Sequence, residues 1–236
     1  MMFQAGAQAA GREPCHLHGD NSAVSTEHYF TAEPAAAADR RRVEFSLLDR
    51  DFRLEAAGGV FSSTRLDPGT SVLLHKAPLP RAGKADPLLD LGCGYGPIAV
   101  VLATAAPSAT VYAVDVNRRA LDLARGNAAA EGVAGRVITA LPHEVPAEMR
   151  FAEIWSNPPI RIGKPELHAL LRQWLPRLAP DGVAWLVVAR NLGGDSLQKW
   201  LIDNGWEAER HASQKGYRVL RVRNTGDGAG ANAENG

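Results

Sequence analysis

The sequence predicts an α/β fold, with a doubly wound, mostly parallel β-sheet that follows an N-terminal β-hairpin. Three observations favour it. Short apolar runs typical of buried strands alternate along the chain with helical segments. One of these runs leads through a glycine loop directly into a helix, as in the βα units of parallel sheets. The 236 residues, of which 45% are hydrophobic, are enough to bury the core of one large domain.

The strands follow from apolar patterning. Two alternating segments, 43–48 and 52–57, flank a charged turn and predict the hairpin. Residues 182–190 form a continuous apolar run, as expected of a strand covered on both faces. The segment 211–219 is a tight connection, so the last strands are expected to pair antiparallel at the sheet edge. The remaining predicted strands lie at 87–92, 110–116, 136–140, 151–156 and 217–223.

The helices follow from three- and four-residue spacing of apolar positions. Residues 165–178 carry the clearest stripe, in which leucines and Trp174 recur on one face. A Gly-rich loop at 58–70 precedes a short helix at 71–77. Further helices are predicted at 97–106, 118–132 and 196–204. Strands and helices therefore alternate through most of the chain.

Both ends are predicted to be flexible tails, at 1–24 and 225–236, which leaves a single domain at 25–224. Cys15, His16 and His18 lie close together in the first tail but lack a second cluster of ligands, so no metal site is expected.

The composition narrows the function class. The 26 basic and 26 acidic residues balance, so any contact with phosphate must use a local basic patch. Two cysteines indicate a reducing, cytoplasmic compartment rather than a disulfide framework. No apolar run reaches the roughly 18 residues of a membrane span, and no secretory signal is evident. The oligomeric state cannot be inferred from these numbers.

The glycine loop lies between a predicted strand and helix and reads DLGCGYG, from Asp90 to Gly96. Glycines at this point permit positive φ and let a ligand approach the backbone. The G-x-G-x-G spacing differs from the G-x-G-x-x-G of pyrophosphate-binding loops, which disfavours NAD. Asp115 ends the next strand, where a carboxylate can accept from two ribose hydroxyls. Together these features predict an adenosyl ligand, with the Cys93 thiol packed and inert.

A second motif, Asn157-Pro158-Pro159, ends a predicted strand near the switch point of the sheet. Two adjacent prolines cannot extend a central strand, so they hold the chain in one shape. The Asn157 side-chain oxygen and the Pro158 carbonyl can then accept two hydrogen bonds from one planar –NH2 group. These bonds favour a pyramidal nitrogen with a free lone pair, which predicts methyl transfer to an amine. The alternative interpretation is a simple strand-ending turn.

The motifs DLGCGYG, YAVDVN and SNPPIRIGK, with GGVFSSTRLDPGTSVLL and SQKGYRVLRVRN, resemble the methyltransferase small domain family of class I S-adenosyl-L-methionine-dependent methyltransferases. Within it, the sequence is similar to RsmC-like guanine-N2 methyltransferases of 16S ribosomal RNA, in a short single-domain form. The resemblance runs from about His28 to Asn224. It implies a seven-stranded Rossmann-like methyltransferase fold, S-adenosyl-L-methionine as cofactor, and ribosomal RNA or the small ribosomal subunit as partner.

The resemblance also implies roles for individual residues. The catalytic set is Asn157, Pro158 and Pro159. Phe61, Ile160, Arg161 and Lys164 are expected at the substrate, with Ile160 standing where many members carry an aromatic residue. The acid expected to bind adenine is not evident, and His143 and Glu144 occupy that region. The cofactor set is Asp90, Gly92, Cys93, Gly94, Tyr95, Gly96, Asp115, Val116 and Asn117.

Basic residues outside these motifs allow two interpretations. Arg40–Arg42 near the hairpin, and Lys215, Arg218, Arg221 and Arg223 on the last strands, either contact phosphates or form a solvated surface. Two alternatives to the ribosomal RNA enzyme also stay open. One is a protein glutamine or small-molecule N-methyltransferase, and the other is a non-catalytic cofactor-binding factor in ribosome assembly.

Overall fold

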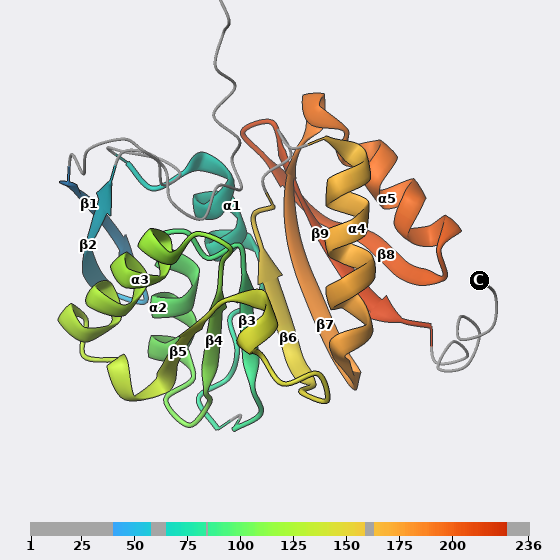
Figure 1. The fold of residues 1–236 in the computed structure, drawn as a ribbon. Coiled ribbons are helices and arrows are strands. Elements are labelled where there is room, and N and C mark those ends of the chain that lie inside the picture. The colour runs from blue at the N-terminus through green and yellow to red at the C-terminus, as the bar shows by residue number, and fades with distance from the viewer. Residues whose placement is uncertain (1–39, 58–64, 84, 159–162, 226–236) are drawn as a thin grey trace, which may run out of the picture.

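The computed structural model describes residues 40–57, 65–83, 85–158 and 163–225. These residues form a two-stranded hairpin beside a seven-stranded sheet that has helices on both faces (Figure 1). The doubly wound, mostly parallel seven-stranded sheet with an N-terminal hairpin, which the sequence predicts, is confirmed. Both predicted tails lie outside the described residues, except for Thr225, which ends the last described segment.

The sheet has the strand order β5-β4-β3-β6-β7-β9-β8. The first five strands in this order are parallel. β9 runs antiparallel to both β7 and β8, as the tight connection between the last two strands predicts. The bounds are β3 (Leu88–Leu91), β4 (Val111–Val114), β5 (Val137–Ala140), β6 (Phe151–Ser156), β7 (Leu178–Ala189), β8 (Trp206–Gln214) and β9 (Tyr217–Asn224).

Two hydrophobic cores lie on the two faces of the sheet, because successive strand residues point to opposite sides. Leu88 of β3 belongs to one core and its neighbour Leu89 to the other. The first core is closed by the helices α1 (Pro68–Lys76), α2 (Pro97–Ala105) and α3 (Arg118–Ala130). The second core is closed by α4 (Lys164–Trp174) and α5 (Gly194–Asp203).

The predicted helix at 165–178 is shorter in the structure. α4 ends at Trp174, a 3₁₀ turn covers Leu175–Arg177, and Leu178 already belongs to β7. Pro176 explains the difference, because a proline has no N–H for the helical ladder and its ring crowds the preceding turn. The apolar stripe is still buried, since Leu171 and Trp174 are at most 1% exposed.

The hairpin pairs β1 (Arg40–Leu47) with β2 (Arg50–Ala57) through a two-residue turn. Both turn residues, Leu48 and Asp49, have positive φ. Two-residue turns of this kind match the right-handed twist of the two strands that they join. The hairpin is fixed to α3 by Asn127, whose side-chain oxygen accepts from Glu55 N at 2.7 Å and whose nitrogen donates to Glu55 O at 2.8 Å.

The chain order of the parallel strands creates a switch point next to β3. The chain passes from β3 to β4 and β5, and then returns to place β6 on the other side of β3. The loops after β3 and β6 therefore leave the same edge of the sheet in opposite directions. In open α/β sheets, ligands bind at such a point.

Gly96, which begins α2, fixes how closely α2 approaches α3. Its φ is +85°, and an added Cβ would lie 2.8 Å from the Cβ of Ala124. We expect Gly96→Ala to lower the free energy of unfolding by about 2–4 kcal/mol, from the left-handed backbone and overpacking together. Urea unfolding measures it. Gly132→Ala is the control, because Gly132 also has positive φ but faces open space. Equal losses in the two variants would contradict the packing argument.

Candidate functional site

The glycine loop connects β3 to α2 with the backbone that its sequence predicts. Gly92, Gly94 and Gly96 all have positive φ. A Cβ added at Gly92 would meet no atom within 4 Å, so this exposed stretch of backbone is open to a ligand. Gly96 in contrast is packed against α3. The loop thus combines one open glycine with one that is buried for helix packing.

Asp115 follows β4 and connects the glycine loop to the start of α3. Its Oδ2 accepts from Gly94 N and its Oδ1 from Asn117 N, each at 2.9 Å. Burial raises the pKa of Asp115, and these backbone donors oppose the rise. An ionised carboxylate has about four acceptor positions, so acceptor capacity remains for a ligand. Asp115 can therefore hold the loop and accept from ribose hydroxyls at the same time.

Asp90 lies at the end of β3 and is fully buried. Its Oδ2 accepts from Ala99 N at 2.9 Å, whereas Oδ1 has no hydrogen-bond partner among the described residues. Burial raises the pKa of Asp90 to about 8, and the charge of Asp115 adds to the rise. The hydrogen bond from Ala99 N lowers the pKa and so opposes the effect of burial. A buried polar atom without a partner costs free energy. The position suits a cofactor that brings a polar group to the loop.

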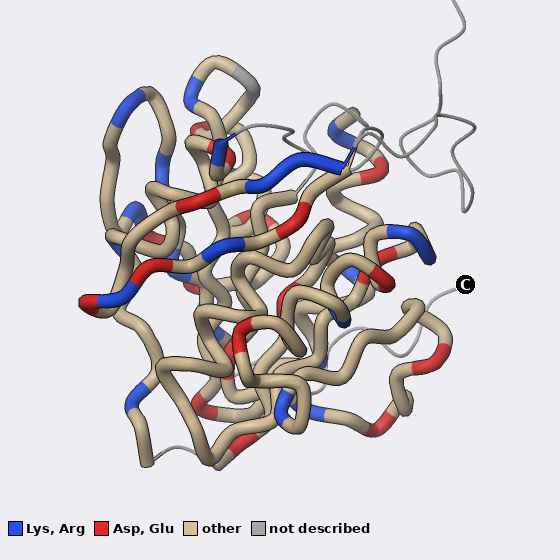
Figure 2. Tube along the Cα trace, turned by 90° about the vertical axis from the view of Figure 1, so that its left-hand side faces the viewer, with Lys and Arg blue, Asp and Glu red and all other residues tan. Residues whose placement is uncertain are grey.

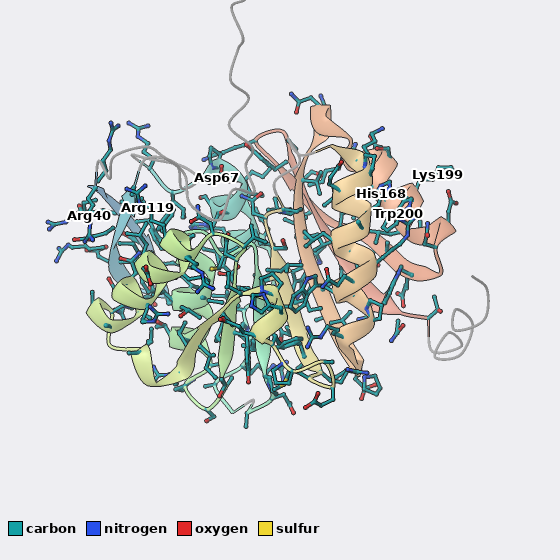
Figure 3. All side chains as sticks on the ribbon, in the orientation of Figure 1. Arg40, Asp67, Arg119, His168, Lys199 and Trp200 are labelled. Carbon is teal, nitrogen blue, oxygen red and sulfur yellow. The ribbon has the colours of Figure 1, made fainter. Side chains whose placement is uncertain are left out.

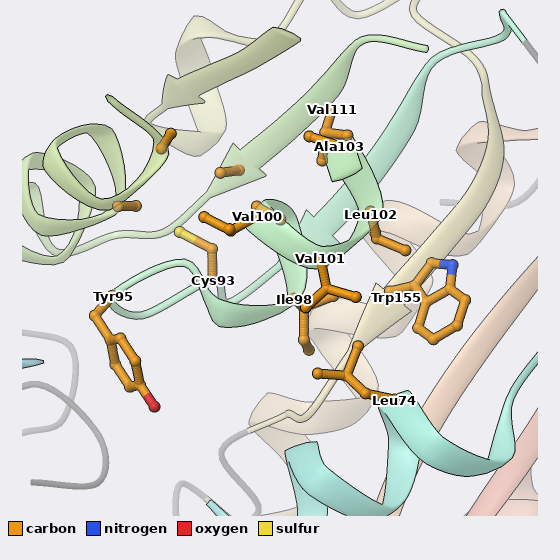
Figure 4. Close-up of a cluster of buried hydrophobic side chains, with 14 of the residues drawn as sticks. Leu74, Cys93, Tyr95, Ile98, Val100, Val101, Leu102, Ala103, Val111 and Trp155 are labelled. Atoms are coloured by element: carbon orange, nitrogen blue, oxygen red, sulfur yellow. The ribbon is translucent and has the colours of Figure 1, made fainter. Parts of the chain in front are cut away.

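Cys93 and Tyr95 pack between these glycines (Figure 4). Cys93 is 4% exposed, so it is packed as predicted, and burial raises the pKa of its thiol well above the ordinary value, which disfavours the thiolate. Tyr95 is 3% exposed and belongs to the same core. Burial raises its pKa, as does the charge of Asp67, so the phenol stays protonated.

Asn157 follows β6 at the same edge as the glycine loop. The Ser156 hydroxyl, which is buried, donates to Leu91 O at 2.7 Å and so ties the end of β6 to the end of β3. The Asn157 Nδ2 donates to Asp67 Oδ2 at 2.7 Å and to Thr70 Oγ1 at 3.0 Å. Both of its N–H groups are thus used, and a flipped amide would set oxygen against oxygen. The Asn157 Oδ1 is left as an acceptor.

Asp67 and Thr70 are the site residues that sequence reasoning missed. Asp67 caps the N-terminus of α1, because its Oδ2 also accepts from Thr70 N at 2.9 Å. It is 9% exposed and lies at the upper edge of the molecule (Figure 3). Gly69 fits this cluster, since an added Cβ would come within 2.9 Å of Asp67 Oδ2 and 3.2 Å of Asn157 Oδ1. The sequence signal is Asp-Pro-Gly-Thr, an N-cap followed by a proline at the first helical position.

The other predicted site residues are partly described. Pro158 is buried next to Asn157, Lys164 begins α4, and Val116 precedes Asn117. The Asn117 side chain caps α3 by accepting from Arg119 N at 3.0 Å. The predicted substrate and catalytic residues Phe61, Pro159, Ile160 and Arg161 lie outside the described residues, as do Cys15, His16 and His18.

The acidic residue in the region after β5 is Glu144, which hydrogen-bonds within its own turn. Glu144 lies in a 3₁₀ turn over Pro142–Glu144 and accepts from Leu141 N at 2.7 Å. Its carboxylate therefore stabilises its own turn. On the last strands, Arg218 pairs with Asp195 and Arg221 with Glu209, so these two arginines have acidic partners within the fold.

Two kinds of site are absent from the part of the chain that the structure describes. No helix there has the length and apolar character to cross a bilayer. No three His, Cys, Asp or Glu residues gather there as a set of metal ligands.

The chain is similar in sequence to known proteins. The model of the methyltransferase small domain family matches residues 51–221. The uncharacterized protein YbxB of Bacillus subtilis is 32% identical over 200 residues, which cover 84% of this chain and 98% of YbxB. The ribosomal RNA small subunit methyltransferase C of Aeromonas hydrophila is 35% identical over 133 residues, or 56% of this chain and 37% of that protein.

A solved structure has the same fold. It is the 16S rRNA N2 G1207 methyltransferase (RsmC) of Thermus thermophilus in complex with AdoMet and guanosine, with a TM-score of 0.64 and 22% identity. The match covers 81% of this chain and 52% of that one. This chain therefore spans about half of the length of that protein, and less than half of the Aeromonas relative.

The raised pKa of Asp90 predicts how stability depends on pH. An unfolded chain loses this proton near pH 3.8, whereas the folded protein keeps it up to about pH 8. Because the folded state binds more protons between these values, its free energy of unfolding decreases as pH rises through this window. Urea unfolding of the cofactor-free protein over a pH series measures the decrease. Asp90→Asn cannot ionise and should show a smaller decrease. The same decrease in both proteins would contradict the assignment.

Proposed function

Because the chain belongs to the methyltransferase small domain family and its cofactor is S-adenosyl-L-methionine, we propose that it methylates an exocyclic amine, the N2 of a guanine in 16S ribosomal RNA. Its partner is then ribosomal RNA or the small ribosomal subunit, and it works in the cytoplasm. The observation that carries this proposal is the way in which the Asn157 amide is held.

The Asn157 amide is oriented by partners on another element. Asp67 and Thr70, both at the start of α1, accept its two N–H groups, so only the Oδ1 acceptor is available to a substrate. The Asp67 carboxylate carries a negative charge next to the amide nitrogen, and this charge makes the amide oxygen a better acceptor. An Asn157 amide whose donors are both occupied and whose acceptor is free selects an N–H donor such as an amine.

The two acceptors at this turn would be the Asn157 Oδ1 and the Pro158 carbonyl, since neither proline of the motif has an N–H of its own. Accepting both hydrogens of an exocyclic amine draws its lone pair out of conjugation with the ring. No strong base is required, because the proton leaves after the nitrogen has acquired its fourth bond. Holding the reacting atoms about 3–3.5 Å apart can contribute about 7–11 kcal/mol in favourable cases.

The residues around the glycine loop fit the cofactor. Gly92 offers open backbone for the methionine part, and the remaining acceptor positions of Asp115 suit the ribose hydroxyls. The Asp90 carboxyl, whose Oδ1 has no partner among the described residues, can form a hydrogen bond with a polar group of the ligand. When bound, the sulfonium supplies the methyl group, whose C–N bond forms while the C–S electron pair stays on sulfur.

The choice of guanine N2 in 16S ribosomal RNA rests on the relatives. Curated relatives from Aeromonas hydrophila and Pseudomonas aeruginosa are named for methylation of small-subunit ribosomal RNA. The Thermus thermophilus protein is named for N2 of a guanine in that RNA. Because this chain spans about half of that protein, the substrate has to be tested directly.

The direct test offers labelled S-adenosyl-L-methionine with three acceptors in parallel: protein-free 16S ribosomal RNA, small ribosomal subunits and total protein. We expect label in RNA or subunits, recovered as N2-methylguanosine after nuclease digestion. Label in protein alone would favour a protein N-methyltransferase. Tight cofactor binding with no transfer to any acceptor would favour a non-catalytic assembly factor.

For Asn157→Ala we expect turnover to fall about 10²-fold or more, because one key contact of the transition state is lost. Cofactor affinity, measured by calorimetry, should stay nearly unchanged. Asn204→Ala is the matched control, since Asn204 is the C-cap of α5 and its side chain donates to Trp200 O at 2.8 Å, away from the site. Loss of cofactor binding in Asn157→Ala would show that the residue serves the cofactor instead.

For Asp67→Ala we expect turnover to fall roughly 10²-fold, because the Asn157 amide is free to turn away from the productive geometry. The missing helix cap should also cost about 1 kcal/mol of stability, which thermal unfolding reports. Asp67→Asn keeps an acceptor oxygen and should recover most of the turnover. If both variants were equally slow while Asn157→Ala was active, Asp67 would have no positioning role.

A further inference from the structure

A groove of about 600 Å³ lies between the β1–β2 hairpin and α3. Four of the residues along it are arginines and only two are acidic. Because the whole chain has a formal net charge of zero, this positive excess is local. The charged residues that line the groove are Arg40, Arg42, Arg53, Arg119, Glu55 and Asp122.

The groove is rigid and directly connected to the cofactor loop. Its floor includes Asn127, which is 2% exposed and donates to Tyr95 O at 2.8 Å as well as to the hairpin. Glu131 adds a second tie, because it accepts from Arg53 N at 2.8 Å and from Arg50 Nη2 at 2.6 Å. The walls of the groove are therefore fixed before any ligand arrives.

The groove reaches the edge of the molecule that carries the site. Arg119 follows the Asn117 cap, which is itself two residues beyond Asp115. Figure 3 shows Arg40 and Arg119 at the hairpin end of the upper edge, where Asp67 also lies. A chain bound along the groove would thus run toward the candidate site.

The arginines can exchange their present partners for phosphate. The Arg40–Glu55 pair is 2.9 Å long, and both side chains are more than half exposed, at 68% and 54%. The Arg53–Glu44 pair is looser, at 3.6 Å, and similarly exposed. Solvent screens such pairs strongly, so they hold their arginines weakly. In Figure 2 the hairpin strands face the viewer, with a continuous basic run at the start of β1 and basic and acidic residues alternating along β2.

One residue of α3, Gly126, faces open space in the groove. It lies in the interior of the helix, where glycine is less favourable than alanine, and an added Cβ there would meet no atom within 4 Å. It lines the groove and is exposed. The groove therefore has room at this point for a small side chain as well as for a ligand.

We propose that this groove binds backbone phosphates of the RNA substrate and guides the RNA toward Asn157. The proposal rests on the proposed function. Arginine suits the task, because its planar fork can donate two parallel hydrogen bonds to one phosphate. Such contacts position a nucleic acid without reading its sequence, which leaves recognition of the target base to the site itself.

The test measures binding of labelled, protein-free 16S ribosomal RNA by filter retention over a series of NaCl concentrations. For Arg42→Gln we expect roughly three- to tenfold weaker binding and a salt slope lower by about one. Arg210→Gln is the matched control, because Arg210 is exposed on β8 at the far end of the sheet, and its binding should not change.

A second pair of variants separates charge from folding. Gly126→Glu places a carboxylate in the groove and should weaken RNA binding roughly tenfold. Gly126→Ala adds no charge and should bind RNA like the wild type, with a slightly higher melting temperature because alanine favours the helix. Calorimetry should show the same cofactor affinity in every variant.

Unchanged RNA affinity and salt slope in both Arg42→Gln and Gly126→Glu would overturn the proposal. So would a Gly126→Ala variant that binds RNA as weakly as Gly126→Glu. A third contrary result would be displacement of RNA by poly-glutamate at lower concentration than by unlabelled RNA. The last result would point to an acidic protein partner. Binding is read separately from methylation, so a wild type that methylates ribosomal RNA without using the groove would remove only this proposal. Groove-dependent RNA binding without methylation would remove only the proposed reaction.

Discussion

The hydrogen bond from the Ser156 hydroxyl to Leu91 O is the interaction on which the candidate site depends, because it joins the ends of β6 and β3. The glycine loop leaves one of these strands and Asn157 follows the other. The two strands are neighbours only because the chain turns back after β5 to the other side of β3. Topology thus brings two halves of the site together, and the buried hydroxyl adds a side-chain bond to the backbone pairing of β3 and β6.

Around this joint the structure keeps three carboxylates in different states. Asp90 is buried, and one of its oxygens lacks a partner among the described residues. Burial raises the pKa of this carboxyl. Asp115 is satisfied by backbone donors from two elements. Asp67 is shared between a helix terminus and the Asn157 amide. Each carboxylate therefore has a separate role. The proposed methyl transfer to an amine does not need any of them as a strong base.

The sequence predicts the site elements well, because each is a local signal. Three glycines between a strand and a helix, an acid at the end of the next strand, and an asparagine before two prolines all fall at strand ends, and parallel strands bring those ends to one edge. The contact between Asn157 and Asp67 could not be predicted, since it joins residues 90 apart, and an N-cap motif carries no information about a second partner. Likewise, the apolar stripe at 165–178 predicts burial correctly but does not reveal that Pro176 ends α4 early. Phe61 and Ile160 lie outside the described residues, so their roles stay predictions.

The hairpin's anchors have a consequence for biosynthesis. β1 and β2 leave the ribosome early, but Asn127 and Glu131, which hold them, follow 72 to 81 residues later. At translation speeds of about 5–20 residues per second, the nascent hairpin waits several seconds for these partners. An isolated two-stranded hairpin is at best marginally stable in water. Its apolar face, including Phe52 and Leu54, is therefore a surface that the growing polypeptide must protect until the third helix has been made.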